Sequence, residues 1–255
     1  MAIFKSGNPA LSEKTFQQSV VINQSEVMTE RGTLNKFFLL FLLVVATASI
    51  TWSAFSQGKN VTSWLWIGLI GGLITAIVLM FKPVWAGFLA PVYALFEGLF
   101  IGGISAIYNF AFKGAETGGT GGIVMQAVGL TFAVVIAMFA LYRFRVIKAT
   151  EKFKSVIITA TIGIAVFYLL ALVLRMFGVD MPLIHSSGTL GIIFSLVVVG
   201  IAALNLILDF DRIEQGAAMG APKYMEWYGA FGLLVTIVWL YLEILRLLAK
   251  LNSRN

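Results

Sequence analysis

Seven long apolar stretches, separated by short polar segments, make up most of this chain. They run over residues 37–55, 61–81, 84–110, 123–142, 156–177, 190–208 and 227–248. Each can cross a bilayer as a helix, since about 20 residues rising 1.5 Å apiece span the hydrocarbon core. The apolar runs are continuous, whereas the strands of a membrane barrel alternate apolar and polar residues. The pattern therefore predicts an all-α, polytopic membrane protein with a single transmembrane domain of seven helices over residues 37–250.

Polar segments define the ends and turns of this domain. Residues 1–36 are polar, mixed in charge, and too long and unpatterned for the basic region of a cleaved signal peptide, so we expect a cytoplasmic tail. Residues 251–255 form a short C-terminal tail. Proline and glycine between the stretches, as at Lys82-Pro83 and in the Gly-rich residues 114–122, predict tight turns. Consecutive helices should therefore be antiparallel.

Composition narrows the class further. Hydrophobic residues make up 59% of the chain, charged residues 12%, and the mean hydropathy is +0.93, which excludes a water-soluble fold. The chain has no Cys, and its one histidine, His185, cannot form an HExxH zinc site. No GxSxG motif and no nucleic-acid motif is present. We predict a protein that is not an enzyme, carries no cofactor, binds no nucleic acid and lies in a lipid bilayer. The sequence does not predict the oligomeric state.

The distribution of basic residues predicts the orientation. With the N-terminus inside, 12 Lys and Arg residues fall on the cytoplasmic side and 6 on the other. Because Lys and Arg concentrate in cytoplasmic loops, the net charge of +6 reports topology, with the N-terminus in and the C-terminus out. Arg246, Lys250 and Arg254 near the C-terminus count against this orientation. They would be explained by six spans and a re-entrant last segment.

Glu97 is the most anomalous acidic residue, because it lies near the middle of the third apolar stretch. No basic residue lies within one helical turn of it. An ionised side chain costs roughly 2.5–3.5 kcal/mol at the centre of a membrane helix on insertion scales. Glu97 is therefore either a protonated residue that fastens two helices together or a functional ion or proton site. The following Gly98 and Gly102 form a GxxxG spacing that predicts close packing of helix backbones.

Asp209 and Asp211 end the sixth stretch, where it meets the interface. On a helix, Asn205, Asp209 and Arg212 share one stripe, whereas Asp211 lies roughly 200° away from Asp209. The two carboxylates should therefore belong to different surfaces. One interpretation is an ordinary charged helix end with Asp209 paired to Arg212. The other is a cation or proton site at the mouth of a conduction path.

Glu243 lies toward the end of the last stretch, three residues before Arg246. This spacing favours a Glu–Arg pair that extends to the membrane interface. Glu243 is also a candidate ion or proton site, because it is an acidic residue in an apolar helix.

Two C-terminal segments resemble a known family. Residues 205–214, Asn-Leu-Ile-Leu-Asp-Phe-Asp-Arg-Ile-Glu, and the last helix from Glu226 to Leu248 are similar to the closing helices of the Bax inhibitor-1 (transmembrane BAX inhibitor motif) family, in its bacterial YccA/YetJ-like branch. Glu97-Gly98 also fits this pattern. The resemblance covers residues 37–250 in outline.

The resemblance implies a seven-helix bundle with the last helix at its centre, in the bacterial inner (plasma) membrane. Bacterial members resemble pH-sensitive calcium leak channels, in which one aspartate from the sixth helix and one from the seventh form a proton-sensing gate. The sixth-helix aspartate corresponds to Asp211, or to Asp209 if the register slips. The seventh-helix aspartate falls near Thr236, so the usual pair of carboxylates is not preserved.

Three functions remain open from the sequence. The first is a pH-sensitive cation leak, with calcium as the transported ion and Asp209 and Asp211 as candidate ligands, because calcium binds several oxygens and carboxylates supply them. Asp211, Asp209, Glu97 and Glu243 are then the gate candidates, with Asn205, Arg212 and Thr236 in support. The second is a non-transporting regulator that binds a membrane protease or another membrane protein. The third is a proton-coupled carrier of a small solute.

Overall fold

The computed structural model describes residues 27–112, 122–179, 181 and 186–253. Within this part of the chain, seven helices are long and apolar enough to cross a membrane. They are α2 (Glu30–Ser56), α3 (Thr62–Phe81), α4 (Ala86–Ala111, preceded by the 3-10 turn Pro83–Trp85), α5 (Ile123–Arg143), α6 (Glu151–Met176), α8 (Thr189–Ala218) and α9 (Met225–Asn252). The predicted all-α bundle of seven helices is confirmed.

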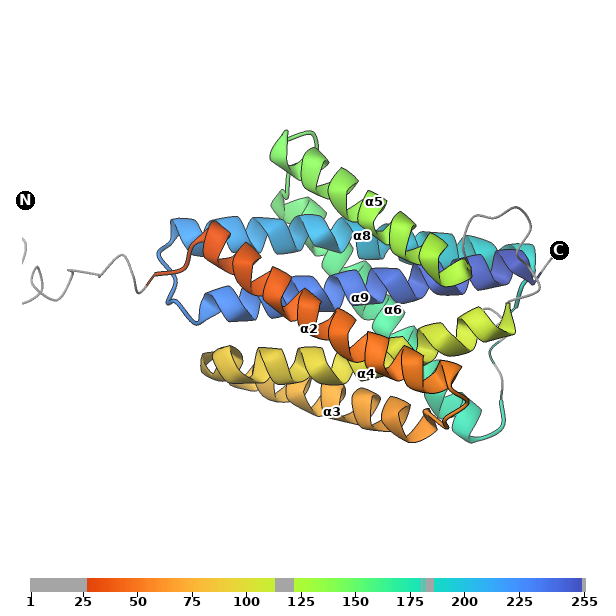
Figure 1. Ribbon diagram of the computed structural model, residues 1–255. Helices are drawn as coiled ribbons and strands as arrows, with labels where there is room; N and C mark the ends of the chain where they lie inside the picture. The colour runs from red at the N-terminus through yellow and green to blue at the C-terminus, as the bar shows by residue number, and fades with distance from the viewer. Residues whose placement is uncertain (1–26, 113–121, 180, 182–185, 254–255) are drawn as a thin grey trace, which may run out of the picture.

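The last helix, α9, lies at the centre of the bundle, as the resemblance implied. It packs against α2, α4, α5 and α8 (Figure 1). More than half of the residues in its most apolar stretch are buried inside the bundle, a larger share than in any other of the described helices. A helix that is apolar around most of its circumference buries more than one face, which places it inside the bundle. Residues carried by α9 therefore face several neighbours at once.

Four helices are longer than the hydropathy pattern predicted. One is α9, which runs over Met225–Asn252 instead of residues 227–248 and so includes the first two residues of the predicted C-terminal tail. α2 begins at Glu30 instead of residue 37, α6 begins at Glu151, and α8 continues ten residues past Leu208 to Ala218. Charged and polar residues fill these extra turns, so an apolar run does not detect them. Capping side chains mark such helix starts better than hydropathy does. Thr29, for example, caps α2 by accepting a hydrogen bond from the Gly32 N–H at 2.9 Å. The segment predicted as a tail over residues 1–36 thus includes the first turns of α2, and residues 1–26 lie outside the described residues.

Small residues bring α2 and α4 together. A Cβ added at Gly98 would collide with the Thr47 hydroxyl and the Val44 carbonyl, and one added at Gly102 would collide with the Ala48 backbone. The GxxxG spacing is therefore used for packing, as predicted. By contrast, α6 packs mainly against α8 and crosses the back of the bundle obliquely (Figure 1). Of the described helices it has the smallest buried share, and polar side chains form several of its contacts with the bundle.

Candidate functional site

The two aspartates of α8 point to different helices. The Asp209 carboxylate accepts a hydrogen bond from the Thr236 hydroxyl of α9 at 2.5 Å. Its nearest basic group is Arg212 at 3.9 Å, whose side chain is 68% exposed. Asp211 instead faces α6. The separation of Asp209 and Asp211 onto two surfaces, predicted from helical geometry, is confirmed.

Asp209 rather than Asp211 therefore faces the residue that takes the place of the seventh-helix aspartate. The resemblance placed the sixth-helix partner first on Asp211 and second on Asp209. The direct bond to Thr236 favours the second register. A carboxylate and a hydroxyl here form the contact between α8 and α9 that the resemblance assigns to two carboxylates in other members, which agrees with the expected loss of the usual pair.

Asp211 belongs to an ionic latch between α6 and α8, formed by Asp211 and Lys154. The Lys154 ammonium lies 3.0 Å from Asp211 and 3.2 Å from Glu151, and Gln215 donates to Asp211 at 2.7 Å. Side-chain exposure is 23% for Lys154 and 13% for Asp211. Sequence reasoning missed Lys154 as a site residue, because it counted only as one basic residue of a cytoplasmic loop.

The other supporting residues divide between two directions. Asn205 turns toward α6, where it donates to the Thr161 hydroxyl at 2.8 Å, and it also donates to the Ile201 carbonyl. Arg212 turns outward. The three residues of the predicted stripe therefore have different surroundings: Asn205 contacts α6, Asp209 contacts α9, and Arg212 is exposed. Asn205 is a second polar contact that holds α6 on α8.

Glu214, one turn beyond Asp211, is bound by residues at the end of α5. The Tyr142 hydroxyl and the Arg145 guanidinium both donate to it. The hydrogen bond from Arg145 to Glu214 and the negative charge of Glu214 raise the pKa of Arg145, which lies in the loop outside the helices. Glu214 is therefore fixed at the surface of the bundle, away from the contact between Asp209 and α9.

Glu97 lies on α4 against α3. Its carboxylate approaches Gly72, where an added Cβ would lie 3.2 Å from Oε2, and it is hydrogen-bonded to Tyr93 one turn earlier. Among the ion pairs of the described residues, none includes Glu97. The structure therefore places Glu97 apart from Asp209 and Glu243 and keeps both interpretations of it open.

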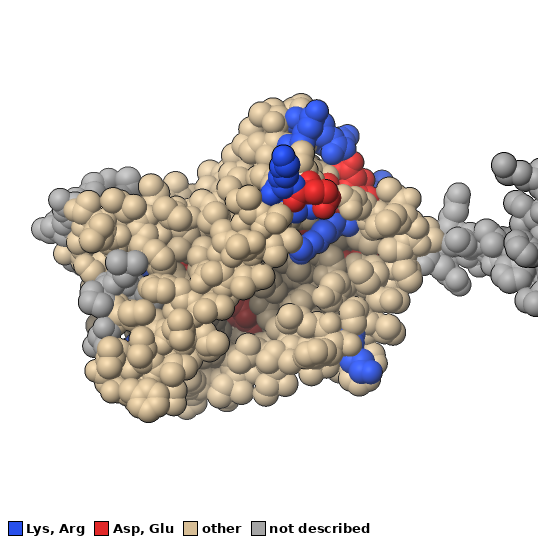
Figure 2. Space-filling model, turned by 180° about the vertical axis from the view of Figure 1, so that it is seen from behind, with Lys and Arg blue, Asp and Glu red and all other residues tan. Residues whose placement is uncertain are grey.

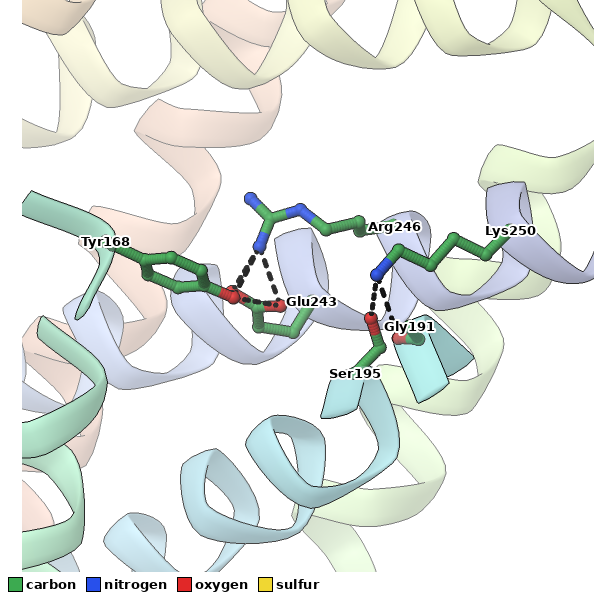
Figure 3. A network of polar contacts seen from close by, with 6 residues as sticks. All are labelled: Tyr168, Gly191, Ser195, Glu243, Arg246 and Lys250. Carbon is green, nitrogen blue, oxygen red and sulfur yellow. Dashed lines mark hydrogen bonds and ion pairs between the residues drawn. The ribbon is translucent and has the colours of Figure 1, made fainter. Parts of the chain in front are cut away.

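Glu243 is buried in a network with α6 (Figure 3). It is 1% exposed, accepts from the Tyr168 hydroxyl at 3.0 Å, and pairs with Arg246 at 2.8 Å. The Arg246 guanidinium also donates to the Tyr168 oxygen at 2.7 Å. The expected Glu–Arg pair is present, but its Glu243 member is buried, and through Tyr168 the pair joins α9 to α6.

Lys250 lies one turn further along α9 and is also buried. Its ammonium donates to the Gly191 carbonyl at 2.9 Å and to the Ser195 hydroxyl at 2.8 Å, both on α8 (Figure 3). Sequence reasoning treated Lys250 only as a terminal charge. An i, i+7 spacing from Glu243 placed both on one side of α9, and this spacing could have indicated a shared environment.

The start of α9 is fixed by another buried carboxylate, Glu226. It is fully buried and receives hydrogen bonds from the Thr29 amide and hydroxyl, each at 2.9 Å. Lys36 of α2 and Lys223 also pair with it. Sequence reasoning missed Glu226, because its position at the edge of an apolar stretch is typical of a solvated helix start.

Charges are unevenly distributed over the two ends of the bundle. Of the 14 Lys and Arg residues that the structure describes, ten lie at the end where α9 begins and four at the end where it finishes. Figure 2 shows the charged side chains gathered at one end of an otherwise tan surface. It also shows an acidic side chain at the floor of a hollow in the face that α6 crosses.

The described residues contain no group of three or more His, Cys, Asp or Glu side chains that could hold a metal ion together. Asp209 and Asp211 do not converge on one point, since their carboxylates contact α9 and α6 respectively. The oxygen donors that meet between α8 and α9 are the Asp209 carboxylate and the Thr236 hydroxyl, which are fewer than the roughly six to eight oxygens of a calcium shell.

Comparison with known proteins identifies the family. No curated protein and no solved structure matches the chain. A family model described as Bax inhibitor 1 like matches residues 8–253, which include all seven helices. The bacterial YccA/YetJ-like branch stays a prediction. The chain belongs to the Bax inhibitor 1 like family and is an integral membrane protein of that family.

Proposed function

We propose that this chain is a pH-sensitive cation leak, with calcium as its transported ion, in which Asp209 is the gate residue. The observation that carries the proposal is the position of Asp209 between α8 and the central helix α9, bonded to Thr236 and 3.9 Å from its nearest basic group. By contrast, Asp211, Glu226 and Glu243 each have a Lys or Arg within ordinary ion-pair distance.

An incompletely neutralised carboxylate in an apolar bundle favours occupation by a cation or a proton. An ionised Asp is costly at this depth unless a positive charge compensates it. A passing calcium ion would supply that charge, and a proton would remove the need for it. Because only one carboxylate and one hydroxyl meet here, binding should be weak enough for the ion to leave again, as conduction requires. Competition between protons and cations at Asp209 would make the flux depend on pH.

The latch of Asp211 and Lys154 supports a second element of the proposal, which is the position of α6. Its ion pair holds the first turn of α6 on α8. Since α6 packs mainly against α8, losing this contact would loosen α6 over the face where Figure 2 shows the hollow. We therefore assign proton sensing to Asp209, which acts on the ion, and control of the position of α6 to Asp211.

The orientation in this proposal has the N-terminus in the cytoplasm of a bacterium. The excess of Lys and Arg at the end where α9 begins supports this orientation under the positive-inside rule. Asp209, Asp211 and the latch then lie toward the cytoplasm, while Glu243 and Lys250 lie toward the outside. The plasma membrane is the location that the predicted branch implies.

Cation flux into proteoliposomes tests the proposal. Purified protein is reconstituted into vesicles that contain a calcium indicator, and protein-free vesicles and vesicles opened by an ionophore serve as references. We expect calcium entry above the protein-free rate, a dependence on pH, and no entry of a large organic cation such as choline. Entry equal to that of protein-free vesicles at every pH would contradict a leak. Co-purification of a membrane protease would then favour the regulator.

A further inference from the structure

An apolar cavity lies between α2, α4, α5 and α9, on the front face of the bundle in Figure 1. Its volume is about 330 Å³. The floor is formed by buried residues of the central helix, including Leu234 and Val238, and the rim includes Val45 of α2 and Phe132 of α5. Both rim residues are more than 40% exposed on the side of the bundle that would face lipid. The cavity therefore opens sideways.

The opening lies between α2 and α5, which make few contacts with each other. The two helices meet at the rings of Phe41 and Phe132, whose centroids are 5.7 Å apart, and each packs separately on α9. Away from this contact, the space between them leads to α9. Since all three are membrane-spanning helices, the opening lies at the depth of the hydrocarbon core.

The cavity offers little to water. Its four hydroxyl groups all take part in hydrogen bonds within the protein: Ser105 with Tyr241 at 2.6 Å, Thr131 with the Ala127 carbonyl, and Ser49 with the Val45 carbonyl. Buried water needs two to four polar partners, and apolar cavities without them stay dry. The occupant must therefore be apolar.

We infer that this cavity binds one hydrocarbon chain of a membrane lipid, which enters between α2 and α5 and lies against α9. The surrounding bilayer supplies acyl chains at this depth. A volume of 330 Å³ is about ten times the ~30 Å³ that one water molecule takes up in the liquid, and a methylene group is of similar size. A helix from a second copy is about 10 Å across with its side chains and would not fit such a space.

Photo-crosslinking tests this inference without reference to ion flux. The wild-type protein is reconstituted in phosphatidylcholine vesicles doped with a phospholipid that carries a diazirine near the middle of one acyl chain. After illumination, adducts are mapped by mass spectrometry. We expect adducts on Leu234 and Val238, which are 1% and 7% exposed and so out of reach of the surrounding lipid. Adducts on Ile67 and Ile70 of α3, which face the lipid, provide the internal reference.

Two variants fill the cavity from opposite walls: Ala48→Phe on α2 and Val128→Phe on α5. Each should abolish the adducts on α9 and leave those on α3 unchanged. Retained α3 adducts and an unchanged melting temperature in detergent show that a variant is folded. The inference is overturned if wild-type protein gives no adducts on α9, the result also expected if a second copy covers the opening. It is equally overturned if a folded filling variant keeps these adducts.

Discussion

Replacing Asp211 with Asn removes the charge that joins α8 to Lys154 of α6 and leaves the shape of the side chain. The 3.0 Å pair is only partly exposed, so its loss should cost about 1–3 kcal/mol of coupling between the helices. Two contacts keep the cost toward the lower end, since Lys154 retains Glu151 and Asn can still accept from Gln215. A change of this size shifts a two-state equilibrium by roughly 5- to 150-fold.

The assay is calcium flux into proteoliposomes between about pH 5 and pH 8. At neutral pH, Asp211→Asn should release α6 from α8 and so change the rate of calcium entry, while the dependence on pH that Asp209 supplies should remain. Glu151→Gln is the matched control, because it removes the 92% exposed partner of Lys154 and leaves the latch intact. The reasoning is refuted if Asp211→Asn conducts at the wild-type rate at neutral pH, or if Glu151→Gln changes this rate equally.

Three further predictions concern other parts of the bundle. If Glu97 lies on the conduction path, Glu97→Gln should strongly reduce cation flux with little loss of stability; normal flux would leave it as a helix fastener, and Glu97→Ala should then lower the melting temperature in detergent. Arg246→Met should destabilise the protein by about 3–5 kcal/mol, because it leaves Glu243 buried and charged, and adding Glu243→Gln should recover much of this loss in thermal melts. A reporter after Asn255 should face outward and one between Ile147 and Lys154 inward; a cytoplasmic C-terminus would contradict seven spans.

The fold was largely predictable because hydrocarbon imposes a simple rule on the chain. A spanning segment must satisfy its own backbone polar groups, so a long apolar run can only be a helix. Helix ends follow a different rule. The first turns of α2 and α6 and the last turns of α8 are polar, and caps such as Thr29 define them better than hydropathy does. The predicted boundaries were therefore too short at these ends.

The candidate site was predictable only in part. Successive residues of an α-helix are rotated by about 100° around its axis, so the sequence alone predicts that Asp209 and Asp211 point in different directions. Which helix each one faces depends on how α6 and α9 pack on α8, and single-helix geometry does not contain this information. For the same reason Lys154, Tyr168 and Glu226 were missed. Each acquires its role from a partner far away in the sequence.

The most direct test of the central claim compares wild-type protein with Asp209→Asn, measured side by side as the initial rate of calcium entry against pH. If Asp209 is the gate at which cations and protons compete, the variant should conduct calcium much more slowly at neutral pH, and its rate should no longer vary with pH. Its melting temperature should stay close to that of wild type, since Asn can still accept from Thr236. A variant that conducts at the wild-type rate with the wild-type pH profile would contradict the account.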